Sequence, residues 1–396
     1  MSETLDLPEL SAAVSGGAAA LRSITKLQPV EGEGGRVFPA TYAQGKYATE
    51  KRRDGEREVE CVLLNSVQSE ANHAELALKE AIERGWIQLP LIEVDFSEVN
   101  QQFRNDLPKL TSLDVPHRLA DAILRDSVLP DGTRFSKSEH AARWGRANIW
   151  NASAIYNLCP TALVFGMWGS PEKPGGLGAK FERAYISEVV AVDALINNQR
   201  FGFRVDPISA SSKVPVLQKA DGGFDVVGEK TKGAQRPSEL NHGNIVFEST
   251  NGGVRCRYAE QTTVVSLGAL RKLHFPANGH ADHKRDDAAR TALAAIAICA
   301  GVLATERGVS LRSRCTLRPV EPRMWELLPP PGEPVKQFSI TGKQGVGLLN
   351  AAVAAAEGAG ISWMKEKLVL KPSKELTDLV RTSQERMAAE GEAVGE

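Results

Sequence analysis

Short apolar runs and longer amphipathic segments follow one another along most of the chain, and each type predicts a different element. Compact runs rich in β-branched residues predict strands over residues 21–30, 58–66, 91–96, 161–169, 185–195, 200–205, 261–275 and 316–320. Helical spacing or an alanine-rich composition predicts helices over residues 67–85, 117–129, 138–158, 286–308 and 348–356. Strands and helices do not alternate strictly, so the pattern predicts an α+β fold rather than a doubly wound sheet.

Residues 206–253 differ from the rest of the chain because they are rich in Gly, Pro, Ser and Asn and have only short apolar runs. This composition predicts an excursion from the core, such as a hairpin. We therefore divide the chain into a flexible N-terminal extension (1–20), one domain with insertions (21–370) and a charged tail (371–396) that is helical or frayed.

Composition limits the classes of function. The 396 residues have a formal net charge of −1, so any nucleic-acid binding must come from a local basic patch. The five cysteines form no CxxC pair, which argues against a disulfide framework or a zinc knuckle and favours a reducing cytoplasm. The N-terminus lacks a signal pattern, and the apolar run at residues 291–305 is too short to cross a bilayer, so we expect no membrane contact.

The stretch GGLGAKFER combines glycines with two cations. A P-loop would need Ser or Thr after the lysine, and a dinucleotide fingerprint would need a third glycine followed by a helix, so mononucleotide binding lacks its context. A ligand-free turn and a loop that holds the phosphates of a polymer remain as alternatives, and the two cations favour phosphate slightly. The candidate RNA-binding residues are Gly175, Gly176, Leu177, Gly178, Ala179, Lys180, Phe181 and Arg183.

A second candidate is NSVQSEANH, where a predicted strand runs directly into a helix. Free N–H groups make such a turn an anion site, whereas the same residues also suit a plain helix cap, which is the more common case. Four polar groups are present where one cap suffices, and this keeps the anion site open. The candidate residues are Ser66, Gln68, Ser69, Asn72 and His73.

Further basic segments are less specific. Arg143 and Arg146 surround Trp144, with Trp150 close by, a mixture that suits phosphates and stacked bases. For the tryptophans we favour an amphipathic helix that places them in the core, and for the arginines both alternatives stay open. The other candidates are Arg36 and Lys46 in a glycine-rich loop, Asn241 and His242 in RPSELNHGN, and Lys343 in a second glycine-rich loop, TGKQGVG. His280 and His283 form one weak metal-binding pair. We find no catalytic motif and expect no catalytic residue, metal or cofactor.

Three long segments resemble a known family: LLNSVQSEANHAELAL, TALVFGMWGSPEKPGGLGAKFERAYISEVVAVDA, and SELNHGNI followed by YAEQTTVVSLGALRKLHF. They are similar to the RAMP-superfamily backbone subunit of the type I-U (I-G) CRISPR surveillance complex. The resemblance extends from about residue 27 to residue 358.

The resemblance implies a ferredoxin-like, RRM-type core with large insertions, likened to a palm, fingers and a thumb, with residues 206–253 as the candidate thumb. It implies a non-enzymatic subunit that polymerises along the spacer of a CRISPR RNA and presents its bases to target DNA, with other complex subunits as partners. The glycine-rich stretch would then lie against the guide RNA. The family commonly has a basic residue where this chain has His73. A metal-dependent ribonuclease using His242, His280 or His283, and a structural protein without RNA contact, are the alternatives.

Overall fold

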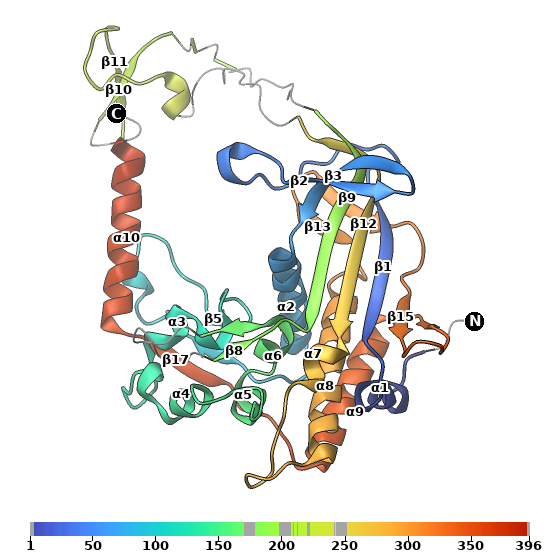
Figure 1. The fold of residues 1–396 in the computed structure, drawn as a ribbon. Coiled ribbons are helices and arrows are strands. Elements are labelled where there is room, and N and C mark those ends of the chain that lie inside the picture. Colours follow the sequence, from blue (N-terminus) through green and yellow to red (C-terminus); the bar gives the residue numbers. More distant parts are fainter. Residues whose placement is uncertain are drawn as a thin grey trace.

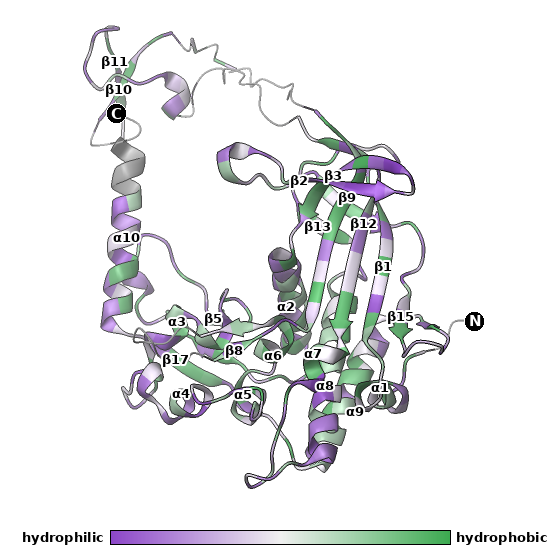
Figure 2. Ribbon diagram, viewed as in Figure 1, coloured by the Kyte–Doolittle hydropathy of each residue, from purple (hydrophilic) through white to green (hydrophobic). Residues whose placement is uncertain are grey.

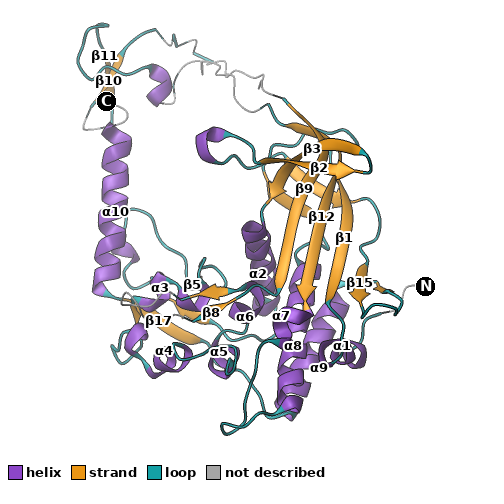
Figure 3. Cartoon of the chain, viewed as in Figure 1, coloured by secondary structure: helices purple, strands orange, loops and turns teal. Residues whose placement is uncertain are grey.

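One large antiparallel sheet organises the molecule (Figures 1 and 3). The computed structural model describes residues 4–169, 179–197, 207–208, 210–211, 213–219, 222–240, 242 and 252–393. Within these residues nine strands form this sheet, in the order β13-β14-β1-β12-β9-β3-β2, with β15 and β16 continuing beside β1. The strands are β1 (Ala20–Pro29), β2 (Thr49–Asp54), β3 (Arg57–Asn65), β9 (Tyr185–Ile196), β12 (Val254–Ser266), β13 (Val309–Arg312), β14 (Cys315–Pro319), β15 (Trp325–Leu328) and β16 (Lys336–Phe338).

The centre of this sheet has a simple connectivity. Along the chain, β1 is followed by helix α2 (Val67–Glu83), then β9, β12, helix α8 (His283–Leu303) and β14. Numbered in that order, these four strands occupy the sheet positions 4-1-3-2, and each is antiparallel to its neighbours. Strand β3 is added beside β9 and leads directly into α2.

The main core lies between the sheet and its helices. Helix α8 is buried along nearly all of Ala289–Val302 because its alanine-rich sequence is apolar on every side. Helices α7 (Leu267–Arg271) and α9 (Gly342–Gly358) pack on it. All five cysteines are free and buried, at Cys61, Cys159, Cys256, Cys299 and Cys315.

The N-terminal segment is part of this core, contrary to the expected flexible extension. Residues Leu7–Ser15 form helix α1, which Asp6 caps by accepting a hydrogen bond from the Glu9 N–H. Leu10 and Val14 are fully buried against the other helices. Arg271 of α7 donates to the carbonyls of residues 13, 14, 16 and 18, so the segment is tied down by polar contacts as well as apolar ones.

A smaller module fills the lower part of the view in Figure 1, beside the large sheet. Its four-stranded sheet has the order β5-β4-β17-β6, comprising β4 (Ile92–Val94), β5 (Leu110–Thr111), β6 (Ser127–Val128) and β17 (Leu368–Pro372). Four short helices surround it: α3 (Ala122–Arg125), α4 (Glu139–Trp144), α5 (Ser153–Leu158) and α6 (Thr161–Phe165). A two-stranded hairpin, β7 (Met167–Trp168) with β8 (Lys180–Phe181), connects this module to β9.

Several predicted elements are wrong in this region. The expected strand 161–169 is mainly helix α6, because its short apolar run is buried on all sides and carries no periodicity that separates strand from helix. The long helices expected over 117–129 and 138–158 are shortened to α3, α4 and α5. The expected strand 261–275 is the end of β12 followed by α7, which Ser266 caps. The predicted strand 200–205 lies outside the described residues.

The excursion and the tail agree with the sequence pattern. Within 206–253, the described residues contain the antiparallel hairpin of β10 (Val216–Gln218) and β11 (Phe224–Val226). The tail forms α10 (Lys374–Ala393), a long helix in which Figure 2 shows hydrophilic and hydrophobic positions mixed over the coloured part. Taken together, the strands and helices form the predicted α+β fold. No helix in the described ranges is long and apolar enough to span a membrane.

Candidate functional site

The first candidate site is the turn from β3 into α2. Strand β3 ends at Asn65, and Ser66 is the N-cap of α2, where its hydroxyl accepts a long 3.4 Å hydrogen bond from the Ser69 N–H. The Glu70 N–H bonds the Ser66 carbonyl at 2.8 Å. In the described part of the chain, the N–H groups of Val67 and Gln68 have no hydrogen-bond partner. The predicted cap is therefore present, and two donors of the first turn remain free.

Three polar side chains belong to the first two turns of α2, which these two donors begin. Gln68 and Asn72 are exposed and His73 is half-buried. Among the described residues, the side chains of all three lack a hydrogen-bond or ionic partner. A solvent-facing turn with free amides and free polar side chains can accept an anion without first breaking internal contacts.

On its buried side, the same turn is hydrogen-bonded to the central strands of the large sheet. Glu70 is 4% exposed, and its carboxylate accepts hydrogen bonds from Asn65, from the Ser187 hydroxyl at 2.8 Å and from the Gln261 amide at 2.6 Å. Ser187 and Gln261 come from β9 and β12, so Glu70 fixes the start of α2 to the centre of the sheet. The sequence does not show this role, because a glutamate in a first helical turn is normally exposed.

The second site is the hairpin that closes the glycine-rich stretch. Gly169 N–H donates to the Ala179 carbonyl at 2.8 Å, and Trp168 pairs with Lys180 across β7 and β8. The Lys180 ammonium lies 4.4 Å from the centre of the Trp168 ring, while Phe181 is buried. Gly175, Gly176, Leu177 and Gly178 lie outside the described residues, so the predicted backbone approach to RNA there stays a prediction.

Arg183 connects this hairpin with α2. Its Nε donates to the Phe165 carbonyl at 3.2 Å, and its side chain packs over Gly166, where a Cβ would lie 2.7 Å from the Arg183 Cγ. Burial and the neighbouring Arg118 lower the pKa of Arg183, while Glu75 of α2 raises it. Arg118 forms a buried bidentate salt bridge with Glu75, with hydrogen bonds of 2.6 and 2.7 Å to the two carboxylate oxygens. The Arg118 backbone has a φ of +52°. The hairpin, the residue 118 turn and α2 therefore share one ionic cluster.

The second glycine-rich segment is not a loop, contrary to the sequence analysis. Residues 342–358 form α9, and a capping box between Thr341 and Gln344 starts the helix. Its glycines permit close packing: a Cβ on Gly345 would lie 3.4 Å from the Cys299 Cα of α8. The Gly342 N–H donates to Glu306 at 2.7 Å, so a carboxylate of the protein already occupies this helix end. Lys343 is exposed beside a cavity of about 610 Å³ between α2 and α9.

The third candidate segment lies next to the hairpin. A Cβ on Gly169 would lie 3.2 Å from the ring of Trp144, which packs against the main core as expected. Trp150 is not in the core, because this residue, in the segment between α4 and α5, is 70% exposed. Arg143 and Arg146 are exposed, and Arg143 pairs with Glu139 at 3.4 Å.

The remaining candidates are separate from these sites or incomplete. Lys46 is exposed, and the Arg36 side chain packs over Gly253, at the start of β12. The His242 ring lies 5.6 Å from that of Phe224 beside the β10–β11 hairpin, and Asn241 lies outside the described residues. His280 and His283 are exposed, and the described residues contain no group of three side chains that could hold a metal ion.

Comparison with known protein families gives a match over part of the chain. Residues 21–195 match the family described as "CRISPR-associated protein GSU0053". The matched stretch is less than half of the chain. It includes β1, β3, the start of α2, the β7–β8 hairpin and nearly all of β9, and so contains both the turn at Ser66 and the stretch that ends at Lys180 and Arg183.

Comparisons with curated proteins and with solved structures were also made for the whole chain. None of the curated proteins matches the chain. Among solved structures, Csc2 of Thermofilum pendens is similar, with 13% identity, a TM-score of 0.28, and 96% of this chain and 80% of that chain covered. A TM-score this low does not support a conclusion about the fold, which rests on the strand order described above.

Proposed function

We propose that this CRISPR-associated chain is a non-catalytic RNA-binding backbone subunit of a type I-U (I-G) interference complex in the cytoplasm. The observation that carries the proposal is the family match over residues 21–195, which contains both anion-binding candidates. In this function, several copies polymerise along the guide, contact the other subunits and present the guide bases to target DNA.

The sheet topology supports the proposal. The sheet order 4-1-3-2, with α2 and α8 connecting the strands, is that of ferredoxin-like folds, to which RRM-type cores belong. The β10–β11 hairpin inside residues 206–253 supports the thumb assignment. We assign the fingers to the insertions between α2 and β9.

The charge distribution supports a phosphate-binding mode. The chain has a net charge of −1, so attraction of RNA must come from local groups such as Lys180 and the free amides of the α2 turn. A guide must be free to vary in sequence, and phosphate contacts carry no sequence information. Both points favour contact with the RNA backbone.

Co-expression with a repeat array tests the proposal directly. We expect purified protein to carry RNA of defined length, with an affinity that falls steeply with salt and hardly changes with spacer sequence. Recovery of protein free of RNA would reject RNA binding and leave a structural assembly protein. A strong preference for one spacer sequence would reject the phosphate mode.

A nuclease assay tests the alternative enzyme. The purified complex is incubated with labelled target RNA and Mg²⁺ or Mn²⁺, and with a sample containing a chelator. We expect intact RNA in both samples. Regular metal-dependent cuts that disappear on replacing His242, His280 or His283 would instead assign a ribonuclease.

A further inference from the structure

Two tryptophans stand out on the surface near the glycine-rich hairpin. Trp150 is 70% exposed and Trp168 is 63% exposed, although indole rings are among the most costly side chains to leave in water. Each ring nevertheless has a defined support on one side. An aromatic ring held in place but open to solvent is a platform for another flat group.

The support of Trp150 is rigid. Its ring stacks on His274, with centroids 5.6 Å apart and planes inclined by 12°. The His274 N–H bonds the Ile149 carbonyl at 2.8 Å and the His274 carbonyl accepts from Ala152 N–H at 2.9 Å, so two backbone bonds join the two segments. Trp150 N–H in turn donates to the Asn148 side chain at 2.9 Å.

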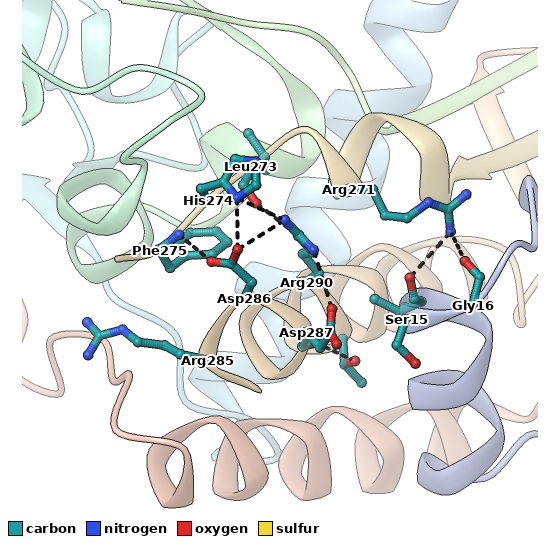
Figure 4. Close-up of polar contacts among 12 residues, drawn as sticks. Ser15, Gly16, Arg271, Leu273, His274, Phe275, Arg285, Asp286, Asp287 and Arg290 are labelled. Carbon is teal, nitrogen blue, oxygen red and sulfur yellow. Dashed lines mark hydrogen bonds and ion pairs between the residues drawn. The ribbon is translucent and has the colours of Figure 1, made fainter. Parts of the chain in front are cut away.

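A buried ionic pair fixes the imidazole from behind. His274 Nδ1 lies 2.8 Å from an Asp286 carboxylate oxygen, and the other oxygen accepts from the Phe275 N–H at 2.6 Å (Figure 4). Arg290 donates to Asp286 at 3.3 Å and to the Leu273 carbonyl at 2.8 Å. Both charged residues lie in α8, so the platform is anchored in the main core.

Trp168 has a cation on its ring. The Lys180 ammonium sits 4.4 Å from the ring centre, and Lys180 has no carboxylate partner among the described residues. A cavity of about 200 Å³ connects the chain segments of the two tryptophans, because Ile149, which precedes Trp150, and Lys180, which pairs with Trp168, both line it. Lys272 is paired with Glu182 at 2.6 Å, so Lys180 is the lysine of this cavity that has no carboxylate partner in the described part of the chain.

We propose that Trp150 and Trp168 stack unpaired nucleobases of a single-stranded nucleic acid, while Lys180 contacts an adjacent phosphate. Aromatic rings next to an uncompensated cation fit this ligand, since each nucleotide supplies a flat base and one negative charge. The inference rests on the proposed function and adds a contact to the bases, which the phosphate mode alone does not include.

The test compares normal RNA with the same RNA in which abasic residues replace the bases. Trp150→Ala and Trp168→Ala should each weaken binding of normal RNA roughly 5- to 150-fold and leave binding of abasic RNA unchanged. Trp150→Phe should retain most of the affinity. Trp86→Ala is the matched control, because Trp86 is 40% exposed and also carries a cation, Arg84, 5.2 Å from its ring. Thermal melts identify variants that fail to fold, for which Trp150→Leu and Trp168→Leu, apolar but without an aromatic face, replace the alanines.

Each outcome decides the proposal. Equal weakening of normal and abasic RNA, or no weakening, overturns base stacking while the proposed RNA-binding function stands. Binding of neither RNA nor single-stranded DNA by the wild-type chain rejects both. Repeating the titration with single-stranded DNA on guide-loaded complex separates the sources: a loss with RNA assigns the platforms to the guide, and a loss with DNA alone assigns them to the target. Defective assembly with intact nucleic-acid binding would assign the tryptophans to a protein contact instead.

Discussion

The N-termini of α2 and α9 are alike in sequence and differ in what the fold does with their backbone donors. Both helices start after a strand, both have a hydroxyl N-cap, and both supplied candidate RNA-binding residues. At α9, three N–H groups have partners. Those of Thr341 and Gln344 donate within the capping box, and that of Gly342 donates to the Glu306 carboxylate. At α2, one long bond from Ser69 to Ser66 is the cap, and the N–H groups of Val67 and Gln68 remain free within the described chain.

The difference teaches that a helix start becomes a ligand site only when the protein leaves it incomplete. A carboxylate at α9 supplies the negative charge that the helix dipole favours. At α2 the buried carboxylate of Glu70 points inward to β9 and β12, so it anchors the turn without covering its outer surface. The following variants test this contrast, starting with the largest expected effect.

Adding negative charge should affect RNA binding at α2 and not at α9. We expect Ser69→Asp combined with Asn72→Asp to weaken RNA binding by about 3 kcal/mol, roughly a hundredfold, because carboxylates replace neutral groups at the proposed phosphate position. Thermal stability should be kept, since acidic residues suit a helix N-terminus. Lys343→Asp changes the net charge by the same amount at α9 and should have little effect. Filter-binding titrations provide the comparison, and equal effects at both ends would remove the distinction.

The glycines of α9 should matter for stability rather than for RNA. Gly345→Leu is expected to lower the free energy of unfolding by about 2 kcal/mol, because a larger side chain cannot fit against Cys299. Gly347 has nothing within 4 Å of a Cβ position, so Gly347→Leu should be neutral or stabilising by up to about 1 kcal/mol. Urea unfolding of both variants measures this. A loss of RNA affinity in folded Gly345→Leu would return this segment to the list of RNA contacts.

Removing the Glu306 carboxylate should leave a free N–H group at the N-terminus of α9, as there is at α2. Glu306→Ala frees the Gly342 N–H and is expected to cost about 1 kcal/mol of stability. The vacant helix end should then bind an inorganic anion, so sulfate should raise the melting temperature of the variant more than that of the wild type. Sodium chloride at equal ionic strength is the control. Identical responses to sulfate would indicate that the Glu306 carboxylate does not occupy an anion site.

The smallest effects are expected from the two caps themselves. Ser66→Ala and Thr341→Ala should each cost about 1 kcal/mol, with the larger loss at Thr341 because its bond is part of a reciprocal capping box. Unfolding curves of the two variants measured side by side test the order. A larger loss at Ser66 would mean that the long Ser66–Ser69 bond is stronger than its length suggests.

The periodic elements were largely predictable, since one apolar face or one continuous apolar run determines them. The predicted helix from residue 67 and the strand from residue 185 are confirmed as α2 and β9. Failures occurred where tertiary packing overrides local pattern. The run at 161–169 is apolar enough for either element, and the glycines at 342 and 345 look like a loop although they permit α8 and α9 to approach closely.

The sequence predicted which residues could belong to the candidate site, but not which of them contact one another. The cap at Ser66 follows from its residue type and position, and Trp144 packs against the core as predicted. The exposure of Trp150, its stack on His274 and the role of Glu70 depend on residues more than a hundred positions away. No local pattern encodes such pairings.

All five cysteines are buried, so the rate at which each thiol is alkylated reports how often its surroundings open. Burial raises the pKa of the Cys256 thiol to about 11 and that of the Cys299 and Cys315 thiols to about 12, so almost no thiolate exists at neutral pH. Alkylating reagents react with thiolate, and each sulfur must reach solvent before it can be modified. The five sulfurs lie on β3, β12, α8 and β14, and just after α5. Mass-spectrometric counting of alkylated cysteines over time would therefore report which of these elements opens to solvent first, and whether bound RNA slows that opening.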